Sequence, residues 1–143
     1  MDYCTIICDI KASKQLKNRA AVQYKIIEML KTANTNFRDI IASPFLITLG
    51  DEWEGLLKYP CDYLEILSFF NSYIPYISFY TGVGIGKIII NNFELTVNQL
   101  DGPSFYRSRE ALNYAKSKQL PLVVLFDNWK NIQSTNNNST SDS

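Results

Sequence analysis

Two acidic residues follow apolar segments at points where a folded chain can bring them together. Asp9 closes the apolar run 3–8, and Asp51 lies in a turn between two segments of strand-like composition. Paired carboxylates at strand ends are suited to holding a divalent cation against a triphosphate. Oxygen ligands are the ones that Mg²⁺ prefers. The sequence therefore predicts a site for Mg²⁺ (or Mn²⁺) formed by Asp9, Asp51 and the main-chain carbonyl of Ile10.

Two further acids follow Asp51 in the sequence. Glu52 is a candidate third ligand or a bridge to a second metal ion. Glu54 lies on the same face as Glu52 if the strand is regular, and an exposed strand charge is the simpler interpretation of Glu54. Aspartate is also common in turns and hairpins. The metal-site hypothesis therefore depends on Asp9 and Asp51 converging in the fold.

A basic stretch without an intervening acid follows Asp9. Its members are Lys11, Lys14, Lys17 and Arg19. Ser13 offers an N-cap for a helix, and a helix N-terminus presents free backbone donors to a phosphate. We therefore expect a nucleotide at the metal to contact Lys11, Ser13, Lys14 and Gly50, the alternative being a solvated lysine face.

Three alternating glycines, Gly82, Gly84 and Gly86, form a stripe along one predicted strand. The segment is no P-loop, because Lys87 is followed by Ile88 rather than by Ser or Thr. Close approach of a helix or of a planar base explains the spacing, and helix packing is the more frequent cause. Gly84 is the predicted contact for a bound base.

Arg109 lies on a predicted helix that begins after Gly102-Pro103. An arginine there could stabilise charge that develops on a phosphoryl group. The alternative is surface pairing with a neighbouring glutamate.

Composition excludes several classes of function. The chain has 143 residues, 46% of them hydrophobic, with 14 basic and 14 acidic side chains and no histidine. The charge balance argues against nucleic acid as a partner, and the lack of histidine excludes Ser-His-Asp catalysis and His-ligated zinc. Three cysteines without paired spacing are expected in the core. No apolar run approaches the roughly 20 residues of a membrane span, so we expect no membrane association and a cytoplasmic location.

Hydrophobic periodicity predicts a single domain over 1–130. The Ser/Thr/Asn-rich composition of 131–143 predicts a disordered tail. Strands are expected at 3–9, 45–49, 52–58, 77–86 and 120–126, helices at 14–37, 62–74 and 103–117, and a small hairpin at 88–97. The order βαββαβ is that of an α+β, ferredoxin-like sheet with helices on one face. In that topology the first and third strands are neighbours, so Asp9 and Asp51 are predicted to meet at one rim.

The residues that carry these predictions resemble the SatD family over nearly all of 1–127. The matching segments are Cys8-Asp9-Ile10 with Ser13-Lys14, Ile47 to Leu57, Gly82 to Gly86, and Asp101-Gly102-Pro103 with Arg109-Glu110-Ala111. The run from Thr48 to Leu57 is the most specific. The resemblance implies a bacterial protein whose longer relatives carry a further helical C-terminal region, and it implies no particular activity.

A more distant resemblance is to class III nucleotide cyclases and GGDEF diguanylate cyclases, which have palm-like domains. It implies that Asp9 with Ile10 and Asp51 hold metal and that Arg109 stabilises the transition state across a homodimer interface. Three departures weaken the case for turnover. Ile47 stands where cyclases carry a base-selecting lysine, only one glycine precedes Asp51, and Phe105 stands where an asparagine is expected.

The sequence thus favours a metal-dependent nucleotide-binding domain whose partner is a nucleoside triphosphate or another nucleotide. If it is an enzyme, the reaction is nucleotidyl transfer or cyclisation. One alternative is a non-catalytic nucleotide sensor. The other is a structural ferredoxin-like module that mediates oligomerisation.

Overall fold

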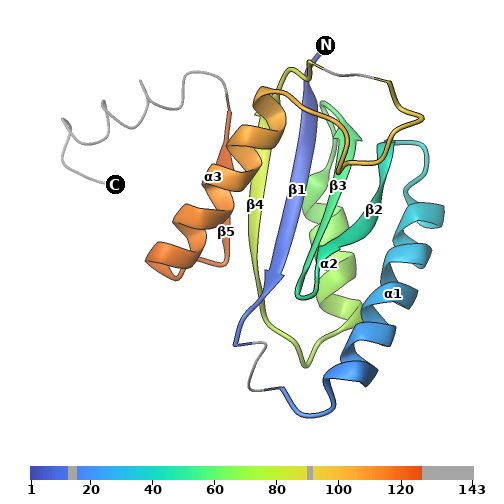
Figure 1. Ribbon diagram of the computed structural model, residues 1–143, viewed down its shortest axis with the longest axis vertical. Coiled ribbons are helices and arrows are strands. Elements are labelled where there is room, and N and C mark those ends of the chain that lie inside the picture. Colours follow the sequence, from blue (N-terminus) through green and yellow to red (C-terminus); the bar gives the residue numbers. More distant parts are fainter. Residues whose placement is uncertain (13–15, 90–91, 127–143) are drawn as a thin grey trace.

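The computed structural model describes residues 1–12, 16–89 and 92–126. In chain order the elements are β1 (Tyr3–Ile10), α1 (Arg19–Asn36), β2 (Ile41–Leu49), β3 (Glu52–Lys58), α2 (Tyr63–Tyr73), β4 (Phe79–Gly86), α3 (Pro103–Lys118) and β5 (Leu122–Leu125). The strands form one sheet in the order β2-β3-β1-β4-β5. β1 is antiparallel to both of its neighbours, and β5 is parallel to β4. The α+β class and the ferredoxin-like order of the first four strands are confirmed (Figure 1).

One face of the sheet carries the main core, covered by α1 and α2. Alternate residues of β1 point into it, namely Cys4, Ile6, Cys8 and Ile10. The predicted stripe of α1 supplies Ile26, Met29, Leu30 and Ala33, which are all buried. An aromatic cluster of Trp53, Phe70 and Phe79 fills the centre, with ring centroids 5.3–6.5 Å apart. Burial of these side chains is the main source of stability here.

The opposite face is covered by α3. Figure 1 shows α3 crossing in front of β4, whereas α2 lies behind the sheet. α3 packs directly on the glycine stripe through two small buried residues, Ser104 and Ser108. The Ser104 hydroxyl donates to the carbonyl of Gly84 over 2.8 Å, and the Ser108 hydroxyl donates to that of Gly82 over 3.0 Å. The expectation of helices on one face therefore holds for α1 and α2 and is wrong for α3. Apolar spacing in the sequence predicts a helix, but it does not predict on which face of the sheet the helix packs.

Several boundaries differ from the predictions. α1 begins at Arg19, five residues later than expected, because Asn18 caps it by accepting a hydrogen bond from the Ala21 backbone. Over 88–97 the described residues form turns and no strand, so the predicted hairpin is wrong there. The predicted sites Ser13 and Lys14 and the tail 131–143 lie outside the described residues. Among the helices that are described, none has the length and apolar character needed to cross a bilayer.

Candidate functional site

The end of β1 and the β2–β3 turn meet at one rim of the sheet. The amide of Ile10 donates to the carbonyl of Asp51 over 3.0 Å, and Asp9 is paired directly with Glu52 across the antiparallel ladder. The convergence of Asp9 and Asp51 that the topology predicts is present in the backbone. It follows from the neighbouring positions of β1 and β3 in the sheet.

The two aspartate side chains have basic partners from opposite faces of the sheet. Lys116 of α3 donates to the carboxylate of Asp9 over 2.6 Å. Arg19, the first residue of α1, donates to that of Asp51 over 2.9 Å. Both basic side chains are about half exposed, and exposed pairs contribute little to stability. The carboxylates are less exposed, at 32% for Asp51 and 14% for Asp9.

Glu52 is committed to Arg109. The guanidinium donates to both carboxylate oxygens over 3.0 and 2.6 Å, and the Thr48 hydroxyl donates to one of them over 3.1 Å. Burial opposes ionisation of Glu52, but the hydrogen bonds and charge of Arg109 outweigh it and hold the pKa of Glu52 below its usual value. In the structure Glu52 therefore forms an ion pair with Arg109, and its role as a third metal ligand stays a prediction. Arg109 pairs across the sheet face and not with a neighbouring glutamate of its own helix.

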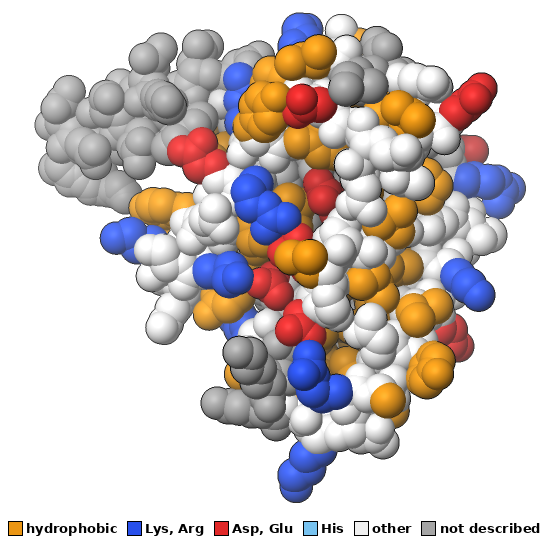
Figure 2. Space-filling view, in the orientation of Figure 1, with side chains coloured by type: hydrophobic (Ala, Val, Ile, Leu, Met, Phe, Trp, Pro, Cys, Tyr) orange, Lys and Arg blue, Asp and Glu red, His pale blue; other side chains and the backbone are white. Residues whose placement is uncertain are grey.

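Glu54 is buried, with 8% of its surface exposed, so its interpretation as an exposed strand charge is wrong. It does lie on the same face as Glu52, as strand alternation predicts. Burial raises the pKa of Glu54 to about 7, with the negative charge of Glu52 adding to the effect and Arg109 opposing it. In Figure 2 acidic and basic side chains alternate down the centre of this face.

A cavity of about 320 Å³ opens at the rim, on the α1 side. It is lined by Ile10, Leu16, Arg19, Ala20, Val22, Gln23, Gly50 and Asp51. Three of the predicted site residues, Ile10, Gly50 and Asp51, therefore share one cavity at the N-terminus of α1. Lys11 does not line this cavity, and its ammonium lies 4.6 Å from the ring centroid of Tyr80 on β4.

Gly84 does not share this cavity. A Cβ atom at Gly84 would lie 2.2 Å from both the Ser104 carbonyl oxygen and the Ser108 amide nitrogen. The face of Gly84 is filled by α3, so the prediction that a base stacks there is wrong. The more frequent cause, helix packing, accounts for the glycine stripe.

The oxygen donors at the rim suit Mg²⁺ in kind. Asp9, Asp51 and the Ile10 carbonyl are hard ligands, and Mg²⁺ usually completes its shell with water and substrate phosphates. Within 1–12, 16–89 and 92–126 no group of three or more His, Cys, Asp or Glu side chains is arranged to hold a metal. The fit therefore depends on two carboxylates and one carbonyl, with the nucleotide supplying the remaining ligands.

Sequence reasoning missed Lys116. It contacts Asp9 although 107 positions separate them, and one lysine on an exposed helix face carries no local signal of such a partner. The spacing from Arg109 to Lys116 is a signal that could have been used. Seven positions are about two helical turns, so both basic residues lie on one side of α3.

The arrangement of the sheet and helices is similar to that of guanylyl cyclase domains. Crystal structures of the monomeric and dimeric guanylyl cyclase domains of the RhoGC fusion protein from the aquatic fungus Blastocladiella emersonii match with TM-scores of 0.55 and 0.53, at 12% and 14% identity. The matches cover 78% of this chain and 74% and 73% of those chains. The catalytic core of a rhodopsin-guanylyl cyclase with converted specificity, in complex with ATPαS, matches with a TM-score of 0.53 at 13% identity, covering 78% of this chain and 71% of that one. At this identity the likeness shows the fold alone, which is similar to that of guanylyl cyclase domains.

The family is defined by sequence. The model of the SatD family matches residues 3–121, and the chain belongs to this family. No match was found among curated proteins.

The Arg109–Glu52 pair leads to a prediction about stability. Arg109→Met should destabilise the fold by about 1–3 kcal/mol, because it leaves the carboxylate of Glu52 buried without its partner. We expect a loss at the low end of this range, because the Arg109 side chain is 44% exposed and water already weakens its ion pair with Glu52. The double variant Glu52→Gln/Arg109→Met should recover much of the loss because no buried charge remains. Urea unfolding at neutral pH measures both; a double variant less stable than Arg109→Met alone would contradict this account.

Proposed function

We propose that the domain binds a nucleoside triphosphate together with Mg²⁺ at the rim where β1 ends. The observation that carries the proposal is the contact between the Ile10 amide and the Asp51 carbonyl, which holds the backbones of Asp9 and Asp51 at the same rim of the sheet. The cyclase-like fold supports the same location. The rim cavity between Gly50, Asp51 and the start of α1 has room for phosphate groups.

Each residue at the rim has a role in this proposal. Asp9, Asp51 and the Ile10 carbonyl hold the cation, and Gly50 leaves space for a phosphate because no heavy atom lies within 4 Å of where its Cβ would be. Arg19 and Lys11 add positive charge beside the phosphates, and Ser13 and Lys14, which precede α1 in the sequence, are proposed to contact the phosphates as well. The bound cation would neutralise phosphate charge and lower the pKa of an attacking hydroxyl.

Binding requires a local exchange of partners. The carboxylate of Asp9 leaves Lys116, and that of Asp51 leaves Arg19, so that both turn towards the cation. In each contact that is lost the basic side chain is about half exposed, and exposed ion pairs are worth about 0–1 kcal/mol. The basic side chains that are released can then pair with phosphate oxygens, which are stronger acceptors.

Binding without turnover is the form of this proposal that the site supports best. Arg109, the candidate for stabilising a transition state, already makes two hydrogen bonds to Glu52 of the same chain. Phe105 occupies the position one turn earlier on α3 and brings no polar group. A catalytic form would require Arg109 to leave Glu52 and act across a homodimer interface. Incubation with labelled ATP and GTP separates the two forms, because a sensor returns the nucleotide unchanged.

The proposal predicts that Asp9→Asn weakens nucleotide binding by about tenfold or more, since the cation loses a charged ligand. Isothermal titration of ATP and GTP in Mg²⁺ measures the effect, and chelation of Mg²⁺ should reduce wild-type affinity in the same way. Asp39→Asn is the matched control, because Asp39 is exposed and lies outside the rim. Equal nucleotide affinity of wild type and Asp9→Asn would contradict the hypothesis that Asp9 holds a metal ion.

A further inference from the structure

A second cavity, of about 480 Å³, lies on the α3 face of the sheet, away from the rim cavity. We call it the α3 cavity; it is lined by Ile7, Glu54, Phe105, Tyr106, Arg109, Glu110 and Asn113. Its volume is within the range of small-molecule sites, about 300–1,000 Å³. Its inner wall is formed by Ile7 and Glu54, which are directly paired between β1 and β3.

The carboxylate of Glu54 has no hydrogen-bond or ion-pair partner among the residues that the structure describes, although more than nine-tenths of the residue is buried. Buried charges are normally paired. Arg109 is the basic residue whose charge acts on Glu54, but both of its terminal nitrogens donate to Glu52. Among the described residues, Glu54 is therefore an acceptor without a donor.

The charges on this face do not balance. β1 and β3 direct three acidic side chains towards α3, namely Asp9, Glu52 and Glu54. On the facing side of α3 the basic residues paired with them are Lys116 and Arg109. Asp9 and Glu52 each have one of these basic partners, so the missing positive charge is the one opposite Glu54. Glu110 adds a further acid on α3 rather than a base.

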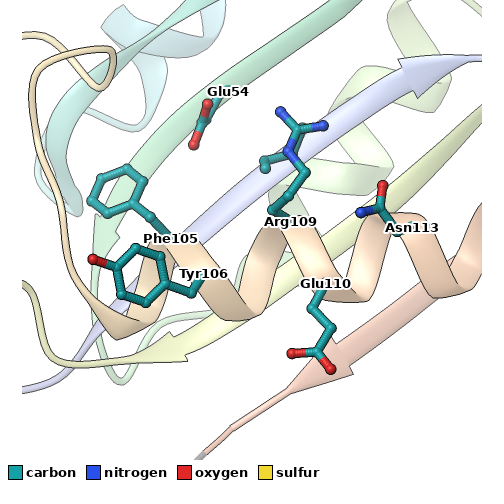
Figure 3. Close-up of a pocket in the computed structure, with 7 residues that line it drawn as sticks. Glu54, Phe105, Tyr106, Arg109, Glu110 and Asn113 are labelled. Atoms are coloured by element: carbon teal, nitrogen blue, oxygen red, sulfur yellow. The ribbon is translucent and has the colours of Figure 1, made fainter.

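The walls around Glu54 are apolar and aromatic. Figure 3 shows the carboxylate of Glu54 projecting from β3 between the ring of Phe105 and the guanidinium of Arg109, with the ring of Tyr106 close to that of Phe105. Glu110 projects from the other side of α3, away from Glu54. Aromatic faces attract cations as well as flat apolar groups.

We propose that the α3 cavity binds a small organic cation, an amine or amidine on a flat apolar body, with Glu54 as its counter-ion. The cationic group donates hydrogen bonds to the Glu54 carboxylate, and the apolar body packs on Ile7 and on the rings of Phe105 and Tyr106. This site is separate from the proposed nucleotide site and does not depend on Mg²⁺ or on a nucleotide.

Benzamidine, a flat monocation, is a suitable probe, and benzamide is its neutral counterpart of nearly the same shape. Titration followed by amide chemical shifts at about pH 8, without nucleotide, should show benzamidine binding about tenfold or more tightly than benzamide, because only the cation satisfies the buried carboxylate. Glu54→Gln should lose benzamidine affinity by about the same factor. Shifts should concentrate on β3 and α3 around the cavity.

Glu94→Gln is the matched control, because it changes the same residue type at an exposed position that does not line the cavity; its affinity should stay near that of wild type. A second test uses wild type alone: affinity should fall as the pH drops from about 8 to about 6, as Glu54 takes up a proton. The charged and titratable groups nearest Glu54 are Glu52, Arg109 and Tyr106, with Asp9 and Lys116 further along the row, whereas Glu110 projects away from it. Absent binding of benzamidine, equal binding of benzamide, or unchanged affinity in Glu54→Gln would each overturn the proposal.

Discussion

Gly84→Val should destabilise the protein by more than about 3 kcal/mol, beyond the usual range for overpacking. A Cβ at Gly84 would lie 2.2 Å from the Ser104 oxygen and the Ser108 nitrogen, which are backbone atoms of α3. Backbone cannot rotate away as a side chain can, so the whole helix would have to shift. Such a shift would also break the hydrogen bond from the Ser104 hydroxyl to the Gly84 carbonyl.

Urea unfolding followed by far-UV circular dichroism measures this loss. Gly50→Ala is the matched control, because nothing lies within 4 Å of a Cβ at Gly50, and it should change the free energy of unfolding by no more than about 0.5 kcal/mol. A Gly84→Val protein with wild-type stability would show that α3 does not rest on β4 as described.

The glycine stripe shows what the sequence could predict. Alternation along β4 places Gly82, Gly84 and Gly86 on one face, and their bare backbone predicts close approach by another element. The structure confirms close approach by a helix. It also excludes a base bound at Gly84, because α3 fills that space. The spacing alone did not exclude a base, since a packed helix and a planar ring both require a strand face without side chains.

The rim was predictable for a different reason. The order βαββαβ fixes β1 and β3 as neighbours, so the meeting of Asp9 and Asp51 follows from topology. Their side-chain partners do not, since Lys116 and Arg19 come from helices on opposite faces. Hydrophobic spacing does not encode on which face a helix packs, and ion pairs between distant elements depend on that choice.

Glu54 was misinterpreted because exposure was inferred from charge. Strand alternation placed it correctly beside Glu52, but a charged residue on a sheet face is normally solvated. Here α3 lies over that face and buries the carboxylate. The sequence signal that remains is the density of acids in Glu52-Trp53-Glu54, which is unusual for a strand that is buried over most of its length.

Glu54→Gln should be more stable than wild type, and the difference in the free energy of unfolding should grow as the pH rises. The ordinary pKa of the carboxyl group is 4.5, and burial raises it to about 7 in the fold. Below about pH 4.5 the group is protonated in both states and contributes nothing. Between the two values the unfolded chain releases the proton while the fold retains it, so wild-type stability falls; above about pH 7 the loss is complete, on the order of 3 kcal/mol.

The variant lacks this titration, so its advantage over wild type should be near zero at about pH 4.5 and largest at about pH 8. Urea unfolding of both proteins at the two pH values measures the difference. Glu94→Gln, a change of the same type at an exposed position, should stay within about 0.5 kcal/mol of wild type at both. Benzamidine should reduce the advantage at about pH 8, because it stabilises only the protein that carries the carboxylate. An advantage that is the same at both pH values would mean that Glu54 is ionised in the fold without penalty, and that water or a protein group already satisfies it.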